Sequence, residues 1–271
     1  MAGYLPSPMG ERTRLDTLLA ERGLFPSRSK AAAAVMAGEV TLEGGREPKP
    51  GQLVESDVEV MVLERPRYVS RGGEKLANAL EATAIDVHGR RCLDAGASTG
   101  GFTDCLLQRG AAGVVAVDVG YGELAWSVRE DDRVVVMERT NARGLSRGDL
   151  PWEPDLVVAD CSFISLRKVL PALIGCAAPR FDALVMVKPQ FELGRGRVGR
   201  GGVVHDVEDR TEAILDVAQF ARSSCGCEVM GFASSGLPGP KGNRETFVHL
   251  AEAGRAGALD DLAVALEAVD A

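Results

Sequence analysis

The side chains best suited to chemistry stand where apolar, strand-like runs end. Asp160 follows the run 156–159, and Lys188 ends the run 183–188. In open α/β sheets, ligands bind outside the carboxyl ends of the strands, so we expect both side chains to face one pocket. A lysine at the end of an apolar strand is partly removed from water, which favours the neutral amine and makes it usable as a base. Two alternatives remain open: Asp160 caps a helix, or Lys188 only extends its amine into solvent.

A glycine-rich turn and a further acid indicate a nucleoside site. The segment 94–102 leaves a strand, passes through small residues and opens a helix, so a ligand can approach the backbone amides. Its spacing matches neither a P-loop nor GxGxxG. Asp118 ends the next strand, where a carboxylate can accept hydrogen bonds from both ribose hydroxyls. Turn and acid together indicate an adenosine compound, and they fit S-adenosylmethionine and NAD equally.

An α/β scaffold is needed to bring these groups together. From Val69 onward, strand-like runs alternate with helical stretches, and the runs are almost continuously apolar. This pattern predicts a parallel sheet covered on both faces. The expected strands are 91–93, 114–118, 134–138, 156–159, 183–188, 228–233 and 246–250. The expected helices are 75–83, 101–108, 124–130, 166–176 and 207–223.

A smaller unit precedes this scaffold. Leucines at helical spacing predict a helix from about Arg12, and Ser27 is a suitable N-cap for a second helix over 28–37. Short strands are expected at 39–43 and 58–62. So small a unit has little core, which suits it to presenting a surface. The expected organisation is a leader at 1–11, this unit at 12–64, a linker at 65–68 and a catalytic domain at 69–271.

Positive charge is segregated along the chain, although the net charge is −8. A phosphate backbone responds to a local basic face rather than to net charge, so nucleic acid remains a candidate partner. A solvated surface is the alternative, and the glycine-rich segment 194–202 is either a mobile loop or an arm that grips phosphates. The candidate RNA-binding residues are Arg12, Arg14, Arg28, Lys30, Arg65, Arg67, Arg71, Arg195, Arg197 and Arg200.

Composition narrows the class of protein further. The chain has 271 residues, and no apolar run approaches the ~20 residues that span a bilayer. Six cysteines without a CxxC pair and three histidines give little support to a metal site or a disulfide framework. No secretory signal is visible at 1–6. We therefore expect a cytoplasmic protein with no metal and no membrane partner; the oligomeric state is unknown from the sequence.

The chain resembles the TlyA, or hemolysin A-like, family, in which an S4-like RNA-binding domain precedes an FtsJ/RrmJ-like methyltransferase domain. The segments that carry the resemblance are 14–16, 27–31, 38–40, 68–76, 160–166 and 187–192, together with Asp57. The resemblance implies an α/β, Rossmann-like S-adenosylmethionine-dependent methyltransferase fold with a small N-terminal α+β S4-like domain. Long matches in this order are more specific than any single glycine turn.

The same resemblance implies a Lys-Asp-Lys-Glu tetrad that serves ribose 2′-O-methylation. The matching positions are Lys75, Asp160, Lys188 and Glu245, with Lys188 as the candidate base. The cofactor would be S-adenosyl-L-methionine, and its implied contacts are Gly96, Ser98, Gly101, Asp118, Asn141 and Asp160. Whether Lys188 removes the proton or only orients the hydroxyl stays open at this point.

The implied partner is ribosomal RNA in ribosomal subunits, with cytidine targets in both small- and large-subunit RNA. Modification of this kind is further implied to confer sensitivity to cyclic-peptide antibiotics such as capreomycin. The family's interdomain tetrapeptide corresponds to 65–68, whose middle residues depart from the family pattern. Three alternatives remain: a non-enzymatic RNA-binding or ribosome-assembly protein, which would not need Lys188; a membrane-lytic hemolysin, which would need an insertable segment; and an NAD oxidoreductase.

Overall fold

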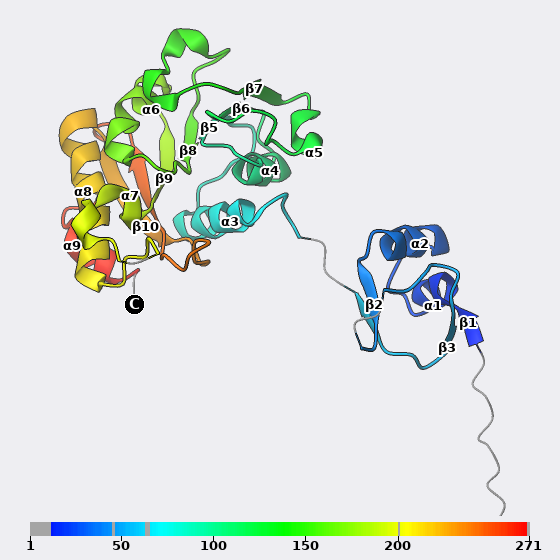
Figure 1. Cartoon of the computed structure of the whole chain (residues 1–271). Coiled ribbons are helices and arrows are strands. Elements are labelled where there is room, and N and C mark those ends of the chain that lie inside the picture. Colours follow the sequence, from blue (N-terminus) through cyan, green and yellow to red (C-terminus); the bar gives the residue numbers. More distant parts are fainter. Residues whose placement is uncertain (1–11, 45–46, 63–65, 200, 270–271) are drawn as a thin grey trace, which may run out of the picture. The chain divides into compact units, whose positions relative to one another are not determined.

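Figure 1 shows a computed structural model of the chain, which describes residues 12–44, 47–62, 66–199 and 201–269. The chain forms two compact units, Met1–Pro66 and Arg67–Ala271. The expected leader 1–11, Arg65 and Arg200 lie outside the described residues, as does the side chain of Arg195. Tyr68, expected in a linker, is 2% exposed and belongs to the core of the second unit.

The first unit packs two helices against short strands. Its elements are β1 (Arg12–Arg14), α1 (Leu15–Glu21), α2 (Arg28–Met36), β2 (Val40–Leu42), β3 (Leu53–Glu55) and β4 (Val60–Val62). Strand β1 pairs with β3 and β2 with β4, both antiparallel. The leucines that predicted the first helix, Leu15, Leu18 and Leu19, form its buried face. Ser27 caps α2 as expected, because its side chain accepts a hydrogen bond from the backbone N–H of Lys30 at 3.3 Å.

The expected start of the first helix, at about Arg12, is wrong. Residues Arg12–Arg14 form β1, and the helix begins only at Leu15. The backbone of Arg14 is extended, with φ −67° and ψ 138°. The three residues are held extended by pairing with β3, a distant segment that helical periodicity cannot reveal.

The second unit is an α/β layer structure built on one twisted sheet. Within the described residues this sheet has seven strands in the order β10-β11-β9-β8-β5-β6-β7. The strands are β5 (Arg91–Ala95), β6 (Gly113–Val117), β7 (Val134–Met137), β8 (Leu156–Ala159), β9 (Asp182–Val187), β10 (Glu228–Ser234) and β11 (Thr246–Ala251). The α-helices are α3 (Arg71–Thr83), α4 (Gly101–Gln108), α5 (Trp126–Arg129), α6 (Leu170–Cys176), α7 (Pro189–Glu192), α8 (Val207–Cys225) and α9 (Leu262–Glu267).

The sheet is not wholly parallel, which corrects the expectation from the apolar runs. Strands β5 to β9 are parallel to one another, whereas β11 runs antiparallel to both β9 and β10. The loop 235–245, described throughout, contains no helix between β10 and β11. Parallel neighbours need a long crossover, usually a helix, so a short loop reverses the chain. The amino end of β11 therefore lies beside the carboxyl end of β9.

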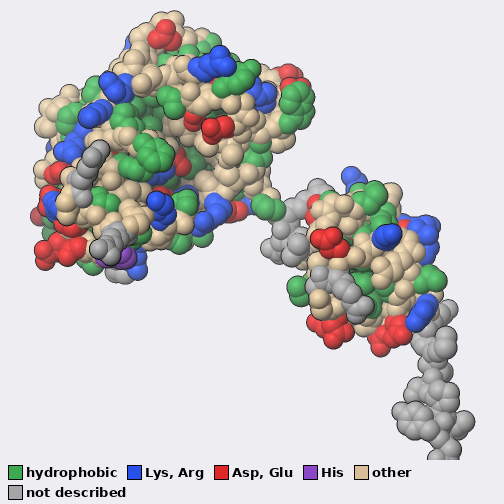
Figure 2. All heavy atoms as spheres, in the orientation of Figure 1, with side chains coloured by type: hydrophobic (Ala, Val, Ile, Leu, Met, Phe, Trp, Pro, Cys, Tyr) green, Lys and Arg blue, Asp and Glu red, His purple; other side chains and the backbone are tan. Residues whose placement is uncertain are grey.

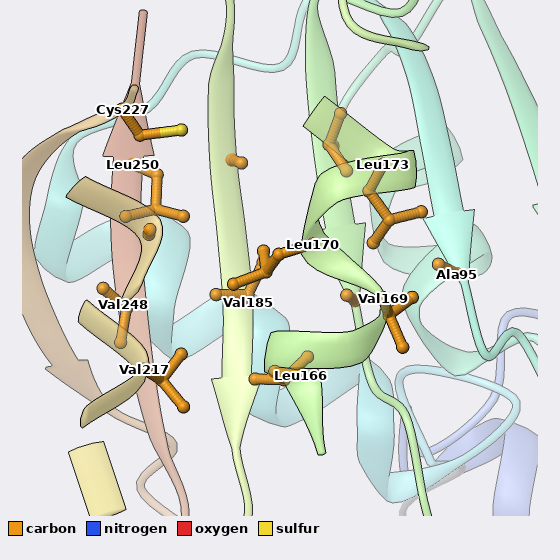
Figure 3. Close-up of a cluster of buried hydrophobic side chains, with 14 of the residues drawn as sticks. Ala95, Leu166, Val169, Leu170, Leu173, Val185, Val217, Cys227, Val248 and Leu250 are labelled. Carbon is orange, nitrogen blue, oxygen red and sulfur yellow. The ribbon is translucent and has the colours of Figure 1, made fainter. Parts of the chain in front are cut away.

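Helices cover both faces of the sheet, as the apolar strands predict (Figure 1). Figure 3 shows one face, where Leu170 of α6 lies toward Val185 of β9 and Val217 of α8 lies beside Val248 of β11. Helices α3 and α4 bury their apolar sides on the opposite face. The sheet is thus a rigid platform whose strand ends can hold side chains in place.

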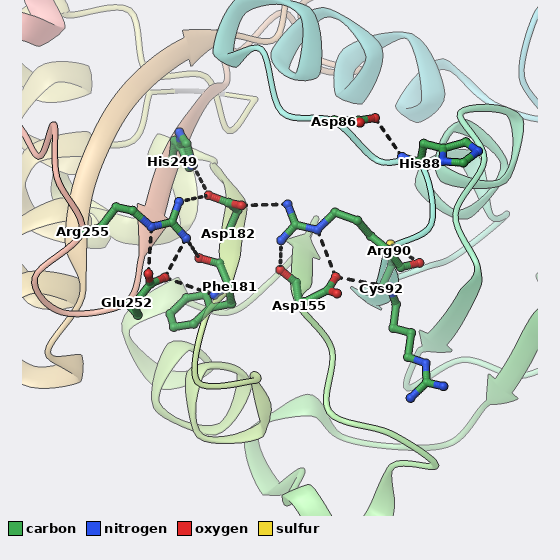
Figure 4. Close-up of polar contacts among 11 residues, drawn as sticks. Asp86, His88, Arg90, Cys92, Asp155, Phe181, Asp182, His249, Glu252 and Arg255 are labelled. Carbon is green, nitrogen blue, oxygen red and sulfur yellow. Dashed lines mark hydrogen bonds and ion pairs between the residues drawn. The ribbon is translucent and has the colours of Figure 1, made fainter.

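An ion-pair network lies at the edge of the sheet where β9 begins, opposite the carboxyl ends of β8 and β9 (Figure 4). Asp182, at the start of β9, pairs with Arg90 at 2.7 Å, with His249 at 3.0 Å and with Arg255 at 3.2 Å. Burial would raise the pKa of Asp182, but the hydrogen bonds with His249 and Arg90 outweigh it and hold the pKa well below its usual range. Charge at this edge is therefore internally compensated.

Neither a membrane-spanning helix nor a metal site is present in the described residues. No helix there combines the length and apolar character needed to cross a bilayer. No group of three or more His, Cys, Asp or Glu side chains in the same residues is placed to hold a metal ion.

Candidate active site

The four residues of the expected tetrad line one cavity of about 320 Å³ at the carboxyl edge of the sheet, and Arg71 lines it as well. Lys75 lies on α3, Asp160 follows β8, Lys188 follows β9, and Glu245 directly precedes β11. The structure thus brings together all four residues of the expected tetrad. Glu245 reaches the cavity because β11 is reversed: Thr246 pairs with Val187, so Glu245 lies level with the end of β9.

The four side chains form two ion pairs. Lys75 donates to Oε2 of Glu245, and the two residues are only 6% and 3% exposed. The Nζ of Lys188 pairs with Oδ1 of Asp160 and also donates to Oγ of Ser162 at 2.9 Å. The side chains of Lys188 and Asp160 are 11% and 24% exposed. The Lys188 pair is the more open of the two, so its amine is better placed to meet a substrate.

A second cavity of about 430 Å³ adjoins the first, because Gly96, Ser98 and Asp160 line both. Asp118 and Asn141 also line it, whereas Gly101 lines only the first. A volume in this range suits a small-molecule ligand. Five of the six expected cofactor contacts therefore surround one space.

Two glycines of the turn are required by close packing. Gly96 has φ 86°, and a Cβ there would lie 2.5 Å from the carbonyl oxygen of Asp160. A Cβ at Gly101 would lie 2.1 Å from Oγ of Ser70, next to α3. Gly101 thus lets α3, which carries Lys75, approach the first residue of α4. Because Gly96 and Gly101 have no side chains, the backbone of the turn can pack closely against its neighbours beside the cavities.

The polar groups of the second cavity are partly engaged by the backbone. Asp118 accepts hydrogen bonds from the N–H groups of Ser98 at 2.8 Å and Gly120 at 2.7 Å. Asn141 accepts from the N–H of Arg143 at 3.1 Å and so caps a short 3₁₀ turn while it lines the cavity. Glu123 lines the same cavity but was missed in the sequence, because a loop acid has no distinctive local pattern.

An apolar slot of about 390 Å³ lies beside Lys188 and Glu245. Phe163 and Phe191 both line it, with ring centroids 5.2 Å apart. Phe163 is 91% exposed and has φ 63°, so its backbone is left-handed and its ring stands in solvent. Sequence reasoning missed it, although a phenylalanine three residues beyond Asp160 in a polar loop was a usable signal.

Asp94 is a buried carboxyl under the glycine-rich turn. It is fully buried, and its Oδ2 accepts a hydrogen bond from Thr103 at 2.7 Å. Oδ1 has no hydrogen-bond partner among the described residues. Burial, with further contributions from the charges of Asp160 and Asp118, raises the pKa of Asp94 to about 7. Its protonation therefore changes near neutral pH.

In the first unit, Arg12, Arg14, Arg28 and Lys30 are all exposed. Arg14 and Arg28 both pair with the buried Asp16, at 2.7 Å and 3.2 Å. Part of this basic surface is therefore held in place by one carboxylate.

In the second unit, the expected RNA-binding arginines have different environments. Arg71 donates to the carbonyl oxygen of Pro238 at 2.8 Å, and Arg67 lies over the ring of Tyr68. Arg197 is bound by Asp209 and Glu212 of α8, so its charge is compensated in this structure. Figure 2 shows Lys and Arg side chains spread around a recessed area on the visible face of this unit.

Comparisons with known proteins agree with this architecture. Residues 68–252 match FtsJ-like methyltransferases and residues 13–60 match the S4 domain, which confirms the expected combination of domains. Over 244 residues the chain is 54% identical to the "16S/23S rRNA (cytidine-2′-O)-methyltransferase TlyA" of Mycobacterium tuberculosis, with 89% of this chain and 91% of that protein covered. It is 38% identical to "Hemolysin A" of Brachyspira hyodysenteriae, with 87% and 98% covered. A solved structure from Streptococcus thermophilus, which bears the name hemolysin, matches with TM-score 0.72 and 38% identity, covering 95% and 94%.

Proposed function

Because the chain belongs to the TlyA family of FtsJ-like methyltransferases, we propose that it methylates the ribose 2′-hydroxyl of a cytidine in ribosomal RNA, using S-adenosylmethionine. The observation that carries the proposal is the junction of two cavities at Asp160. One is lined by the glycine-rich turn and by the carboxylates of Asp118 and Glu123, and the other by two lysine–carboxylate pairs. The fit of the second cavity, of about 430 Å³, to the cofactor rests on its volume and its carboxylates. When bound there, S-adenosylmethionine supplies an electrophilic methyl group.

We assign proton removal to Lys188. A ribose hydroxyl is a poor nucleophile until a base accepts its proton, and general bases contribute roughly 10²–10⁴-fold to such rates. Lys188 first gives the proton of its ion-paired ammonium to solvent. Its amine then accepts the proton of the ribose hydroxyl, and the paired carboxylate of Asp160 stabilises the ammonium that forms again. Lys75 and Glu245 hold each other on the buried side of the same cavity and keep the hydroxyl oriented.

The apolar slot beside Lys188 suits the base of the target nucleotide. A base in a structured RNA must leave its stack to bring its ribose into a cavity, and aromatic rings stabilise unstacked bases. Phe163 offers an exposed ring next to Phe191, and Lys188 lines the same slot. We therefore place the base against Phe163 and the ribose toward Lys188.

Replacing Phe163 by alanine is expected to raise KM for the RNA about tenfold, with a smaller change in kcat, because stacking on one ring is worth about 1–3 kcal/mol. The ring is 91% exposed, so the fold should be unaffected. Steady-state methylation with varied RNA concentration measures the effect. Phe163→Tyr keeps the aromatic face and serves as the matched control. Equal KM values for the alanine variant and the wild type would contradict the placement of the nucleotide base in this slot.

We place RNA binding on the exposed basic residues of the S4 unit. Binding through phosphate contacts weakens steeply as the salt concentration rises, so the affinity of this chain for RNA should do the same. We place the reaction in the cytoplasm, where ribosomal subunits are present.

The direct test of the proposed function uses the purified chain, S-adenosylmethionine with a labelled methyl group, and ribosomal subunits that lack the modification. After digestion to nucleosides, mass spectrometry should find the label in 2′-O-methylcytidine. Subunits incubated without the protein provide the control. Label on a base rather than a sugar, or no transfer to either subunit, contradicts the proposal.

A further inference from the structure

Two carboxylates stand at one end of the cofactor cavity. Asp118 and Glu123 both line this cavity, together with Ser98 of the glycine-rich turn. Neither acid has an ion pair with a cation among residues 12–44, 47–62, 66–199 and 201–269 whose contacts are described. Adjacent negative charges without a cation repel each other, so hydrogen-bond donors between them are stabilising.

The two carboxylates approach the same point. A Cβ placed on Gly120 would lie 2.8 Å from Oε1 of Glu123 and 3.1 Å from Oδ1 of Asp118. Both oxygens therefore border the position that a side chain of residue 120 would occupy. Two hydroxyl groups on adjacent carbons could each donate to one of these carboxylates.

The two acids differ in how much hydrogen-bonding capacity they retain. Both oxygens of Asp118 already accept a backbone N–H, from Ser98 and from Gly120. The hydrogen bond described for Glu123 is a long one, from the hydroxyl of Ser98 to Oε2 at 3.4 Å. A carboxylate has about four acceptor sites, so Glu123 has the greater unused capacity. Asp118 thus holds the backbone of the turn in place and also lines the cavity.

The loop that carries Glu123 is held by three backbone contacts. The N–H of Gly122 donates to Oε1 of Glu138 at 2.8 Å. The N–H of Arg139 donates to the carbonyl oxygen of Gly120 at 3.0 Å, and that of Ala125 donates to Thr99 at 3.1 Å. Glu123 is exposed, but its backbone is tied both to the segment after β7 and to the glycine-rich turn. A ligand group there meets a preorganised acceptor.

We infer that Glu123 is a second ribose-binding residue, which accepts a hydrogen bond from one hydroxyl of the cofactor's ribose while Asp118 accepts from the other. The inference rests on the proposed function, because it assigns this cavity to S-adenosylmethionine. It adds to the single acid at the end of β6 that the sequence predicts. It also explains why the chain has glycine at position 120, where a side chain would fill the space between the acceptors.

Isothermal titration calorimetry with S-adenosylhomocysteine tests the inference without requiring catalysis. Glu123→Gln should weaken binding about tenfold, since the neutral amide oxygen of glutamine is a weaker acceptor than the carboxylate. Glu130→Gln removes the same charge from an exposed residue at the end of α5 and should bind like the wild type. Thermal unfolding of both variants checks that the fold is retained.

Analogues of S-adenosylhomocysteine that lack the 2′- or the 3′-hydroxyl identify the contact. One of the two analogues should bind Glu123→Gln and the wild type with equal affinity, because its missing hydroxyl is the donor to Glu123. A Glu123→Gln variant that binds S-adenosylhomocysteine as tightly as the wild type overturns the inference alone. So does a defect that persists with both analogues. A wild-type protein that binds no S-adenosylhomocysteine overturns the proposed function together with the inference.

Discussion

Substituting Lys188 by alanine should reduce methyl transfer by roughly 10²–10⁴-fold, the range expected for loss of a general base. Lys188 lies between Asp160 and Ser162 at the junction of the cavities, so its amine is placed to receive the proton of a ribose hydroxyl. S-adenosylhomocysteine should bind nearly as before, because Lys188 does not line the cavity that holds the glycine turn and Asp118. Single-turnover rates, together with calorimetry, measure the two effects separately.

Lys188→Arg distinguishes a base from an orienting cation. Arginine keeps the positive charge but is effectively always protonated, so it cannot accept the hydroxyl proton. If Lys188 is the base, the arginine variant should be as inactive as the alanine variant. Substantial activity in Lys188→Arg would instead assign the residue to orientation. Lys168→Ala, which removes an exposed lysine from a nearby 3₁₀ turn, is the control and should retain full activity.

The alanine variant also separates the enzyme from a non-enzymatic assembly factor. A protein that acts only by binding RNA would keep its cellular function without Lys188. Cells that carry Lys188→Ala should therefore lack the 2′-O-methyl group, whatever their ribosome content. Full methylation by this variant would contradict the assignment of the base.

The raised pKa of Asp94 should make the folded protein less stable as the pH rises from 5 to 8, by about 3 kcal/mol from this group alone. Its pKa is about 7 in the folded chain, against 3.8 for an ordinary aspartate. Between those values the folded protein keeps a proton that the unfolded chain has lost. The contribution to stability is therefore largest below pH 4 and is lost as the pH rises through 7. At higher pH, a charge is forced into a site where Oδ1 lacks a described hydrogen-bond partner.

Asp94→Asn removes this titration while keeping the size of the side chain. Urea unfolding at pH 5 and pH 8 should show the variant gaining about 3 kcal/mol of stability relative to the wild type between the two pH values. Asp182 does not interfere, since its lowered pKa confines its effect to more acidic pH. A difference between variant and wild type that stays constant with pH would contradict a raised pKa for Asp94.

Several features follow from local sequence alone. The apolar runs that end at Asp160 and Lys188 predict two buried strands, and parallel strands necessarily present their carboxyl ends at one edge. The same reasoning brings the glycine-rich turn and Asp118 to that edge, and the structure has both beside the second cavity. Short-range patterns of this kind encode which residues are buried and how the backbone turns.

Lys75 and Glu245 came only from the resemblance to a family, because neither stands in a pattern that points to chemistry. Glu245 reaches the cavity through the reversal of β11, and Lys75 through the close packing of α3 on Gly101. Both depend on contacts between segments far apart in the chain. Local periodicity carries no information about such contacts.

The amino-acid sequence by itself determined the class of fold, the basic stretch 12–38 of the first unit and the edge of the sheet where ligands bind. The fold class and the ligand-binding edge depend on apolar spacing and turn residues, and the basic stretch depends on composition. Tertiary structure alone decided that Arg12–Arg14 form a strand, that β11 is antiparallel, and that Glu123 and Phe163 face the cavities. The physical reason is that strand pairing and side-chain exposure depend on distant partners. Their stability comes from the packing of the whole unit rather than from the preference of any one segment.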